Sequence, residues 1–161
     1  MRGLRLMGHP LHPALVHFPV ALWTASLAAD GAALATGAAF WGPAAWWCLA
    51  AGLAAAALAA VAGFVDYSLL PPKHPGFRAA TAHMLTMSFS AMCFLVSALL
   101  RGGPGSAAGL GAVICSGLGF LALLAGGWLG GTLVYRFGVA VEPVERLEPS
   151  ARDDTRSRTT S

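Results

Sequence analysis

The chain has 161 residues, of which 57% are hydrophobic and only 11% are charged. Soluble domains carry charges on about a quarter of their residues, so this composition excludes an ordinary soluble protein and indicates an integral membrane protein. The formal net charge of +3 comes from scattered residues and not from a basic stripe with interleaved aromatic residues. We therefore expect no nucleic-acid partner.

Four stretches are apolar enough to cross a bilayer, which requires about 20 mostly apolar residues. In chain order they are residues 14–35, 44–66, 79–100 and 110–135. Short gaps rich in Gly and Pro separate them, so successive helices should be antiparallel neighbours. The sequence therefore predicts an all-α integral membrane protein, a four-transmembrane-helix up-down bundle formed by one domain over residues 1–141.

The positions of Lys and Arg in the loops predict the orientation, because cytoplasmic loops are enriched in them. With four spans, both termini and the middle loop lie on one side of the membrane. That side holds most of the basic residues, whereas the other side holds only Arg101. We predict that both termini are cytoplasmic. Residues 142–161 lack apolar periodicity, and we expect them to form a disordered polar tail.

A segment of unusual composition opens the first apolar run. Residues 8–19 contain three of the five histidines and three of the ten prolines. Pro13 suits the first helical position, where a missing N–H costs nothing. Pro19 either kinks the helix beside His17 or precedes the helix, and the sequence leaves both open. Because the run also contains Asp30, we expect it to be a true span and not a cleaved signal peptide.

Two histidines lie at matched depth in this bundle. His17 is about one turn into the first run and His83 about one turn into the third, counted from the cytoplasmic side. The first and third helices of an up-down bundle are usually diagonal, so these rings can face each other across the core. We predict that His17 and His83 bind a cofactor, either a b-type haem or a metal ion with Asp66 as an oxygen ligand.

Further polar residues occur at the same level. Ionisable groups at membrane depth cost several kcal/mol unless they are paired or face protein or water. We therefore predict one polar site near the cytoplasmic side, in which Asp66 and Arg136 can neutralise each other. Besides the two predicted ligands, its members are His9, His12, Asp66, Tyr135 and Arg136.

The fourth run contains two overlapping GxxxG pairs, formed by Gly126, Gly127, Gly130 and Gly131. Helix association in lipid depends on close packing, which small residues permit. These glycines can pack within the bundle or support a homo-oligomer, and the sequence leaves both open.

Several motifs carry a family resemblance. They are His9-Pro10-Leu11-His12-Pro13, Leu15-Val16-His17-Phe18-Pro19, Asp30, residues 63–66, His83 and residues 127–141. Over about residues 8–141 the chain resembles the bacterial four-span membrane family catalogued as domain of unknown function 2231. The resemblance implies a location in the bacterial plasma (inner) membrane. Relatives fused to Rieske-type iron–sulfur domains, and a similarity to b-type cytochrome bundles, imply a redox or haem-binding role and a redox partner protein.

Three functions stay open at this point. The first is haem or metal binding in membrane electron transfer, the second is proton, ion or small-solute handling, and the third is that of a structural membrane subunit. The sequence contains no nucleophile–base pairing, phosphate-binding loop or HExxH motif, so we expect no enzyme in its own right. The lipid bilayer is a partner in all three.

Overall fold

Four long helices dominate the computed structural model, which describes residues 3–105 and 107–141. They are α2 (His17–Thr36), α3 (Trp41–Ser68), α4 (Phe77–Arg101) and α5 (Leu110–Tyr135), and a short α1 (Leu11–Leu15) precedes α2. With α1 joined to α2, the four candidate spans are 25 to 28 residues long, with mean hydropathies of 1.3 to 2.2. Helices of this length exceed the roughly 30 Å of a hydrocarbon core. The predicted fold class, an all-α four-helix membrane bundle, is confirmed.

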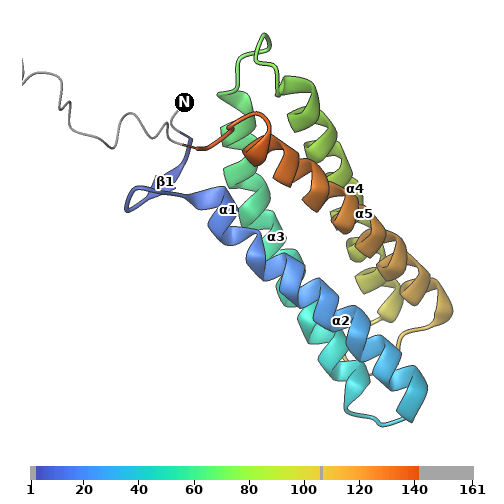
Figure 1. The fold of residues 1–161 in the computed structure, drawn as a ribbon. Coiled ribbons are helices and arrows are strands. Elements are labelled where there is room, and N and C mark those ends of the chain that lie inside the picture. Colours follow the sequence, from blue (N-terminus) through green and yellow to red (C-terminus); the bar gives the residue numbers. More distant parts are fainter. Residues whose placement is uncertain (1–2, 106, 142–161) are drawn as a thin grey trace, which may run out of the picture.

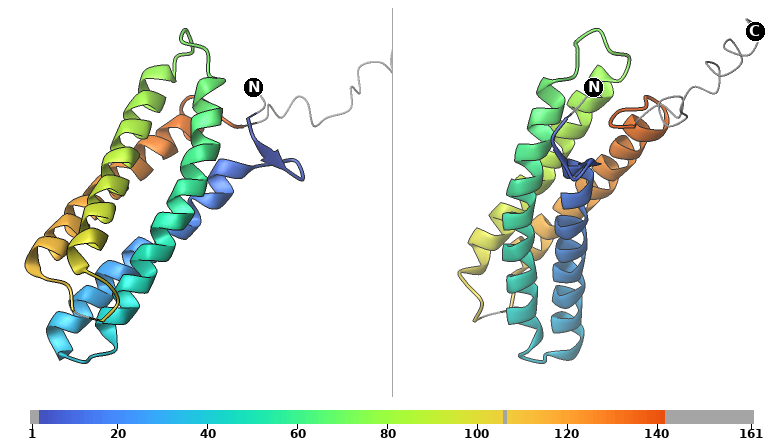
Figure 2. Two further views of the ribbon diagram at one scale, coloured as in Figure 1. Left: turned by 180° about the vertical axis from the view of Figure 1, so that it is seen from behind. Right: turned by 90° about the vertical axis from the view of Figure 1, so that its left-hand side faces the viewer.

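The helices pair into two antiparallel hairpins, which we call the first hairpin (α1, α2 and α3) and the second hairpin (α4 and α5) (Figure 1). The α2–α3 and α4–α5 connections lie at one end of the bundle, which we call the Arg101 end. The α3–α4 connection, α1 and the last described residues lie at the other, which we call the terminal end (Figure 2). The two hairpins therefore run in the same direction through the bundle.

Glycine and proline set the helix boundaries. Gly37 and Gly102 follow α2 and α4 in the left-handed conformation, with φ of 64° and 68°. A residue in this conformation commonly closes a helix, and Gly adopts it without a Cβ penalty. Pro71 and Pro72 follow α3, where the chain leaves the helix and turns toward α4.

The first span begins at Leu11, earlier than residue 14, where the apolar run had placed it. The helix is interrupted at Val16, whose φ of −64° and ψ of −20° keep the backbone nearly helical. Pro19 then lies buried in the first turn of α2, where its missing N–H disturbs little. The chain therefore breaks just before His17, and α1 carries His12 into the bundle.

The central core joins the two hairpins through aromatic rings. Trp23 of α2 and Phe94 of α4 stack with ring centroids 4.3 Å apart and planes 20° from parallel. Both side chains are almost fully buried, and they pack with Leu49 and Leu123 in one cluster. Many other large apolar side chains, among them Phe64 and Leu121, lie exposed on the outer surface of the bundle. That surface suits lipid, which solvates apolar side chains.

A short β-hairpin precedes α1 and extends to one side of the bundle (Figure 1). In it β1 (Arg5–Leu6) pairs antiparallel with β2 (His9–Pro10), so that Leu6 lies opposite His9. Met7 and Gly8 form the turn, with φ of 50° and 83°.

Candidate functional site

Two histidines meet at the terminal end of the bundle, His12 from α1 and His83 from α4. Their ring centroids are 6.4 Å apart and their planes are 83° from parallel. Both rings are half-buried. Because α1 and α4 belong to different hairpins, this pair bridges the two halves of the protein.

Each histidine is oriented by a backbone carbonyl of its own hairpin. His12 Nδ1 lies 2.8 Å from the Ala59 carbonyl oxygen of α3, and His83 Nδ1 lies 2.8 Å from the Gly126 carbonyl oxygen of α5. A carbonyl can only accept, so both Nδ1 atoms donate and each carries a proton. When such a ring is neutral, Nε2 is the atom with a free lone pair, and this is the form in which histidine ligates a metal.

Glycine provides the space for each ring. A Cβ atom on Gly63 would lie 2.7 Å from His12 Cε1, and one on Gly130 would lie 3.2 Å from His83 Cε1. Each glycine follows the accepting carbonyl by one helical turn. The two rings are therefore seated in the same way, on a carbonyl and a glycine of the neighbouring helix.

His17, the predicted partner of His83, is exposed, and its Nδ1 lies 3.3 Å from the Ala14 carbonyl oxygen of the preceding turn. The structure brings His12 to His83 in its place. The reason is the early start of the first span, because a helix that begins at Leu11 already carries His12 at the level where depth counting from residue 14 placed His17.

The other residues of the predicted polar site are dispersed over the terminal end. The Asp66 carboxylate accepts a hydrogen bond of 2.9 Å from the Leu4 backbone N–H and so holds the N-terminal segment. The Arg136 guanidinium lies over the ring of Phe137, 5.7 Å from its centroid, and not beside Asp66. Tyr135 is 92% exposed, and His9 is exposed in the β-hairpin. The structure does not gather these four side chains around the histidine pair.

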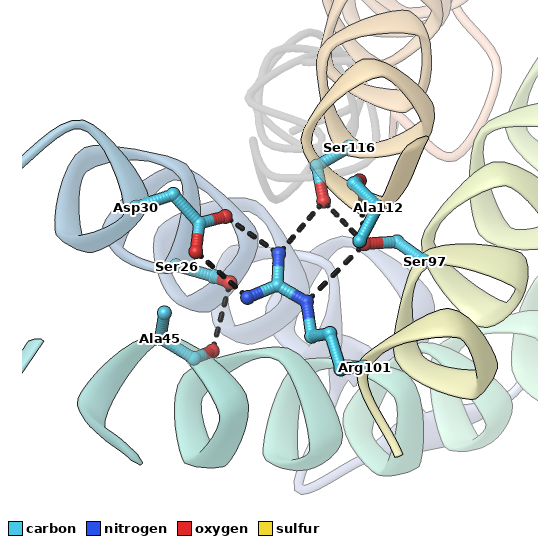
Figure 3. Close-up of polar contacts among 7 residues, drawn as sticks. All are labelled: Ser26, Asp30, Ala45, Ser97, Arg101, Ala112 and Ser116. Atoms are coloured by element: carbon cyan, nitrogen blue, oxygen red, sulfur yellow. Dashed lines mark hydrogen bonds and ion pairs between the residues drawn. The ribbon is translucent and has the colours of Figure 1, made fainter. Parts of the chain in front are cut away.

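A second polar cluster is buried near the Arg101 end (Figure 3). The Arg101 guanidinium donates through Nη1 to Asp30 Oδ1 over 2.7 Å and through Nη2 to Asp30 Oδ2 over 2.5 Å. Ser97 and Ser116 add hydroxyl contacts to the guanidinium, each 3.3 Å long. The side chains of Asp30 and Arg101 are each only 2% exposed. Sequence reasoning treated Arg101 as a loop charge and so missed this ion pair.

These contacts follow one spacing along the chain. Arg101 follows Asp30 by 71 residues, and the same spacing relates His12 to His83, Trp23 to Phe94 and Ser26 to Ser97. The residues of α3 that these side chains contact also correspond, at a constant spacing along the chain, to the contacted residues of α5. Ser26 Oγ donates to the Ala45 carbonyl and Ser97 Oγ to the Ala112 carbonyl, each over 2.8 Å.

Glycines beneath the aromatic rings correspond in the same way. A Cβ on Gly52 would meet Trp23, and a Cβ on Gly119 would meet Phe94. The two hairpins are thus structural repeats, and three pairs of equivalent residues contact each other: His12 with His83, Trp23 with Phe94, and Asp30 with Arg101. Contact between equivalent residues is the mark of a two-fold axis, which here runs along the bundle. We call these pairs the histidine, aromatic and ionic tiers.

The glycine motif of α5 divides between two faces. Gly126 and Gly130 pack against Met87 and His83 of α4, whereas a Cβ on Gly127 would meet no atom within 4 Å and one on Gly131 only a carbon of Tyr135 at 4.0 Å. Two of the four glycines therefore serve packing within the chain. A homo-oligomer through the outward pair stays a prediction.

Comparison with known proteins identifies the family. A search of curated proteins and a search of solved structures each found no similar protein. The family model described as "Predicted membrane protein (DUF2231)" matches residues 8–143, which include all four spans and the three tiers. The chain therefore belongs to this family of predicted membrane proteins, DUF2231.

Proposed function

We propose that this protein binds a b-type haem between its two hairpins, where His12 and His83 would hold the iron, and that it takes part in membrane electron transfer. The observation that carries the proposal is the histidine tier, in which two rings from different hairpins lie with centroids 6.4 Å apart. A backbone carbonyl of its own hairpin engages Nδ1 of each ring, which leaves Nε2 as the atom that would hold the iron. His12 replaces His17 as the proposed second ligand.

The donor set favours haem over a bare metal ion. Protein sites for metal ions use about four or more ligands. Within residues 3–105 and 107–141, no group of three or more His, Cys, Asp and Glu side chains could hold such an ion. A haem needs only two ligands from the protein, because the porphyrin supplies the other four nitrogens. A histidine pair without a third donor fits that requirement.

The surrounding residues would prepare the two histidines for this role. The Ala59 and Gly126 carbonyls fix the tautomer and the ring plane, which spares the entropy of ordering the rings on binding. Because a two-fold axis relates the two rings, a haem between the hairpins would meet a histidine on each of its two sides. When bound, a haem iron would accept and release one electron.

A redox partner and an orientation complete the proposal. We propose that the terminal end faces the cytoplasm of a bacterium and that a partner protein exchanges electrons there. Arg5, Lys73 and Arg136 lie at that end, whereas Arg101 at the other end is buried in an ion pair and is no loop charge. This distribution agrees with the excess of Lys and Arg in cytoplasmic loops.

The test is a difference spectrum of reduced against oxidised protein, purified in mild detergent from cells supplied with a haem precursor. We expect a b-type spectrum, with one haem per chain by pyridine haemochrome assay. His12→Ala and His83→Ala should each abolish it while helical circular dichroism is retained. His17→Ala is the matched control, because His17 is exposed and should leave the spectrum unchanged. A colourless wild-type protein with intact helices would refute the proposal.

A further inference from the structure

The two-fold relation between the hairpins raises a question of pairing. Each hairpin presents an equivalent surface to the axis, so a first hairpin could in principle meet another first hairpin as well as a second hairpin. In the histidine tier such like pairing would again place His beside His. In the aromatic tier it would stack Trp23 on Trp23 or Phe94 on Phe94. Neither tier distinguishes like from unlike partners.

The ionic tier is different, because the equivalent residues carry opposite charges. Pairing of two first hairpins would place Asp30 against Asp30, and pairing of two second hairpins would place Arg101 against Arg101. At these positions each side chain is only 2% exposed, so water cannot screen the repulsion. An unpaired charge buried at membrane depth is strongly unfavourable, whereas the unlike pair is bidentate and hydrogen-bonded.

We infer that Asp30 and Arg101 determine which hairpins dock, so that a first hairpin accepts only a second hairpin, from its own chain or from a second copy. The inference stands on the ion pair and the repeat, and it does not depend on haem. Ser97 and Ser116 add to this selectivity, because their hydroxyls, both from the second hairpin, accept further hydrogen bonds from the Arg101 guanidinium. The first hairpin has Leu49 at the position equivalent to Ser116, so it offers no hydroxyl there to accept a hydrogen bond from a guanidinium.

Charge-reversed full-length chains test this inference. Asp30→Arg alone places two arginines on the axis, and Arg101→Asp alone places two aspartates there. Expressed singly, each variant should lose most of its monodisperse material in detergent. The double variant Asp30→Arg/Arg101→Asp restores an opposite pair, and we expect it to recover a monodisperse peak at the wild-type position.

The decisive experiment is co-expression of the two single variants with different affinity tags. The arginine-bearing first hairpin of one chain then matches the aspartate-bearing second hairpin of the other, and the remaining two hairpins match as well. We expect tandem purification to yield a 1:1 dimer with exchanged hairpins. Asp30→Arg co-expressed with wild type is the control and should not co-purify, because the wild-type hairpins satisfy each other within one chain.

Three results would overturn the inference. One is a single variant that stays as monodisperse as wild type, since like charges would then be tolerated. Another is a double variant that does not recover. The last is recovery of the double variant without co-purification of the single variants, since the ion pair would then stabilise one chain without selecting partners between chains.

Discussion

At the scale of single residues, close packing in this protein depends on glycines beneath large rings. A Cβ on Gly52 would lie 2.5 Å from Trp23 Cδ1, and Trp23 is stacked on Phe94 and cannot move aside. We predict that Gly52→Ala lowers the free energy of unfolding by about 1–3 kcal/mol, the usual cost of overpacking. Gly117→Ala is the matched control, because nothing lies within 4 Å of its position in α5. Thermal unfolding in detergent should show a lower Tm for Gly52→Ala alone.

The turn of the β-hairpin holds a strained residue. Met7 is 93% exposed and has a φ of 50°, a conformation that costs an L-residue with a side chain about 1 kcal/mol or more. Asn tolerates this conformation better and is favoured before Gly in such turns. We predict that Met7→Asn slows hydrogen exchange of the Leu11 amide, which donates over 2.9 Å to the Leu4 carbonyl and closes the hairpin. Met7→Val should accelerate it, and equal exchange in both variants would contradict this account.

At the scale of helices, equivalent serine hydrogen bonds in the two hairpins should contribute unequally to the free energy of unfolding. Ser26 Oγ donates to the Ala45 carbonyl, and Ser97 Oγ donates to the Ala112 carbonyl, each over 2.8 Å. Ser97 also contacts Ser116 Oγ and Arg101 Nε, so its hydroxyl belongs to the shell of a buried charge.

We therefore predict that Ser26→Ala costs about 0.5–1 kcal/mol, an ordinary value for one hydrogen bond in a membrane bundle. Ser97→Ala should cost more, because it removes an acceptor from the buried Arg101 guanidinium. Chemical unfolding in mixed micelles measures both. If Ser26→Ala lowered the free energy of unfolding more than Ser97→Ala, the serine hydroxyls beside Arg101 would not stabilise the ion pair.

The sequence predicts helices well here and helix faces poorly. Long apolar runs broken by Gly and Pro determine where spans occur, because lipid demands about 20 apolar residues whatever their packing. Which side chain faces the axis depends on where the helix starts, and the start of α1 at Leu11 brings His12, and not His17, beside His83. His83 was predicted as a site residue from its place in a helix that begins after a clear loop, and the structure places it in the histidine tier.

At the scale of the whole molecule, the repeat was present in the sequence but could not be recognised from identity alone. Gly and Ala recur throughout such chains, so the match of Gly52 with Gly119 and of Gly63 with Gly130 carries little weight by itself. A comparison of the two halves of the sequence does not reveal that Asp30 is equivalent to Arg101, since the two residues have opposite charges. The two-fold arrangement is revealed only by the contacts between helices, in which equivalent side chains pack on equivalent carbonyls and glycines of α3 and α5.

The orientation of the bundle in the membrane is the last prediction. With Arg101 paired to Asp30, the described residues of the loops at the Arg101 end contain no Lys or Arg, whereas Arg5, Lys73 and Arg136 lie at the terminal end. Such a difference should hold the terminal end in the cytoplasm. A fluorescent protein fused after Val141 should therefore fluoresce, and alkaline phosphatase inserted after Gly103 should be active. Adding lysines beside Gly103 should weaken this preference, whereas reversed reporter signals in the wild type would mean that the basic residues do not set the topology.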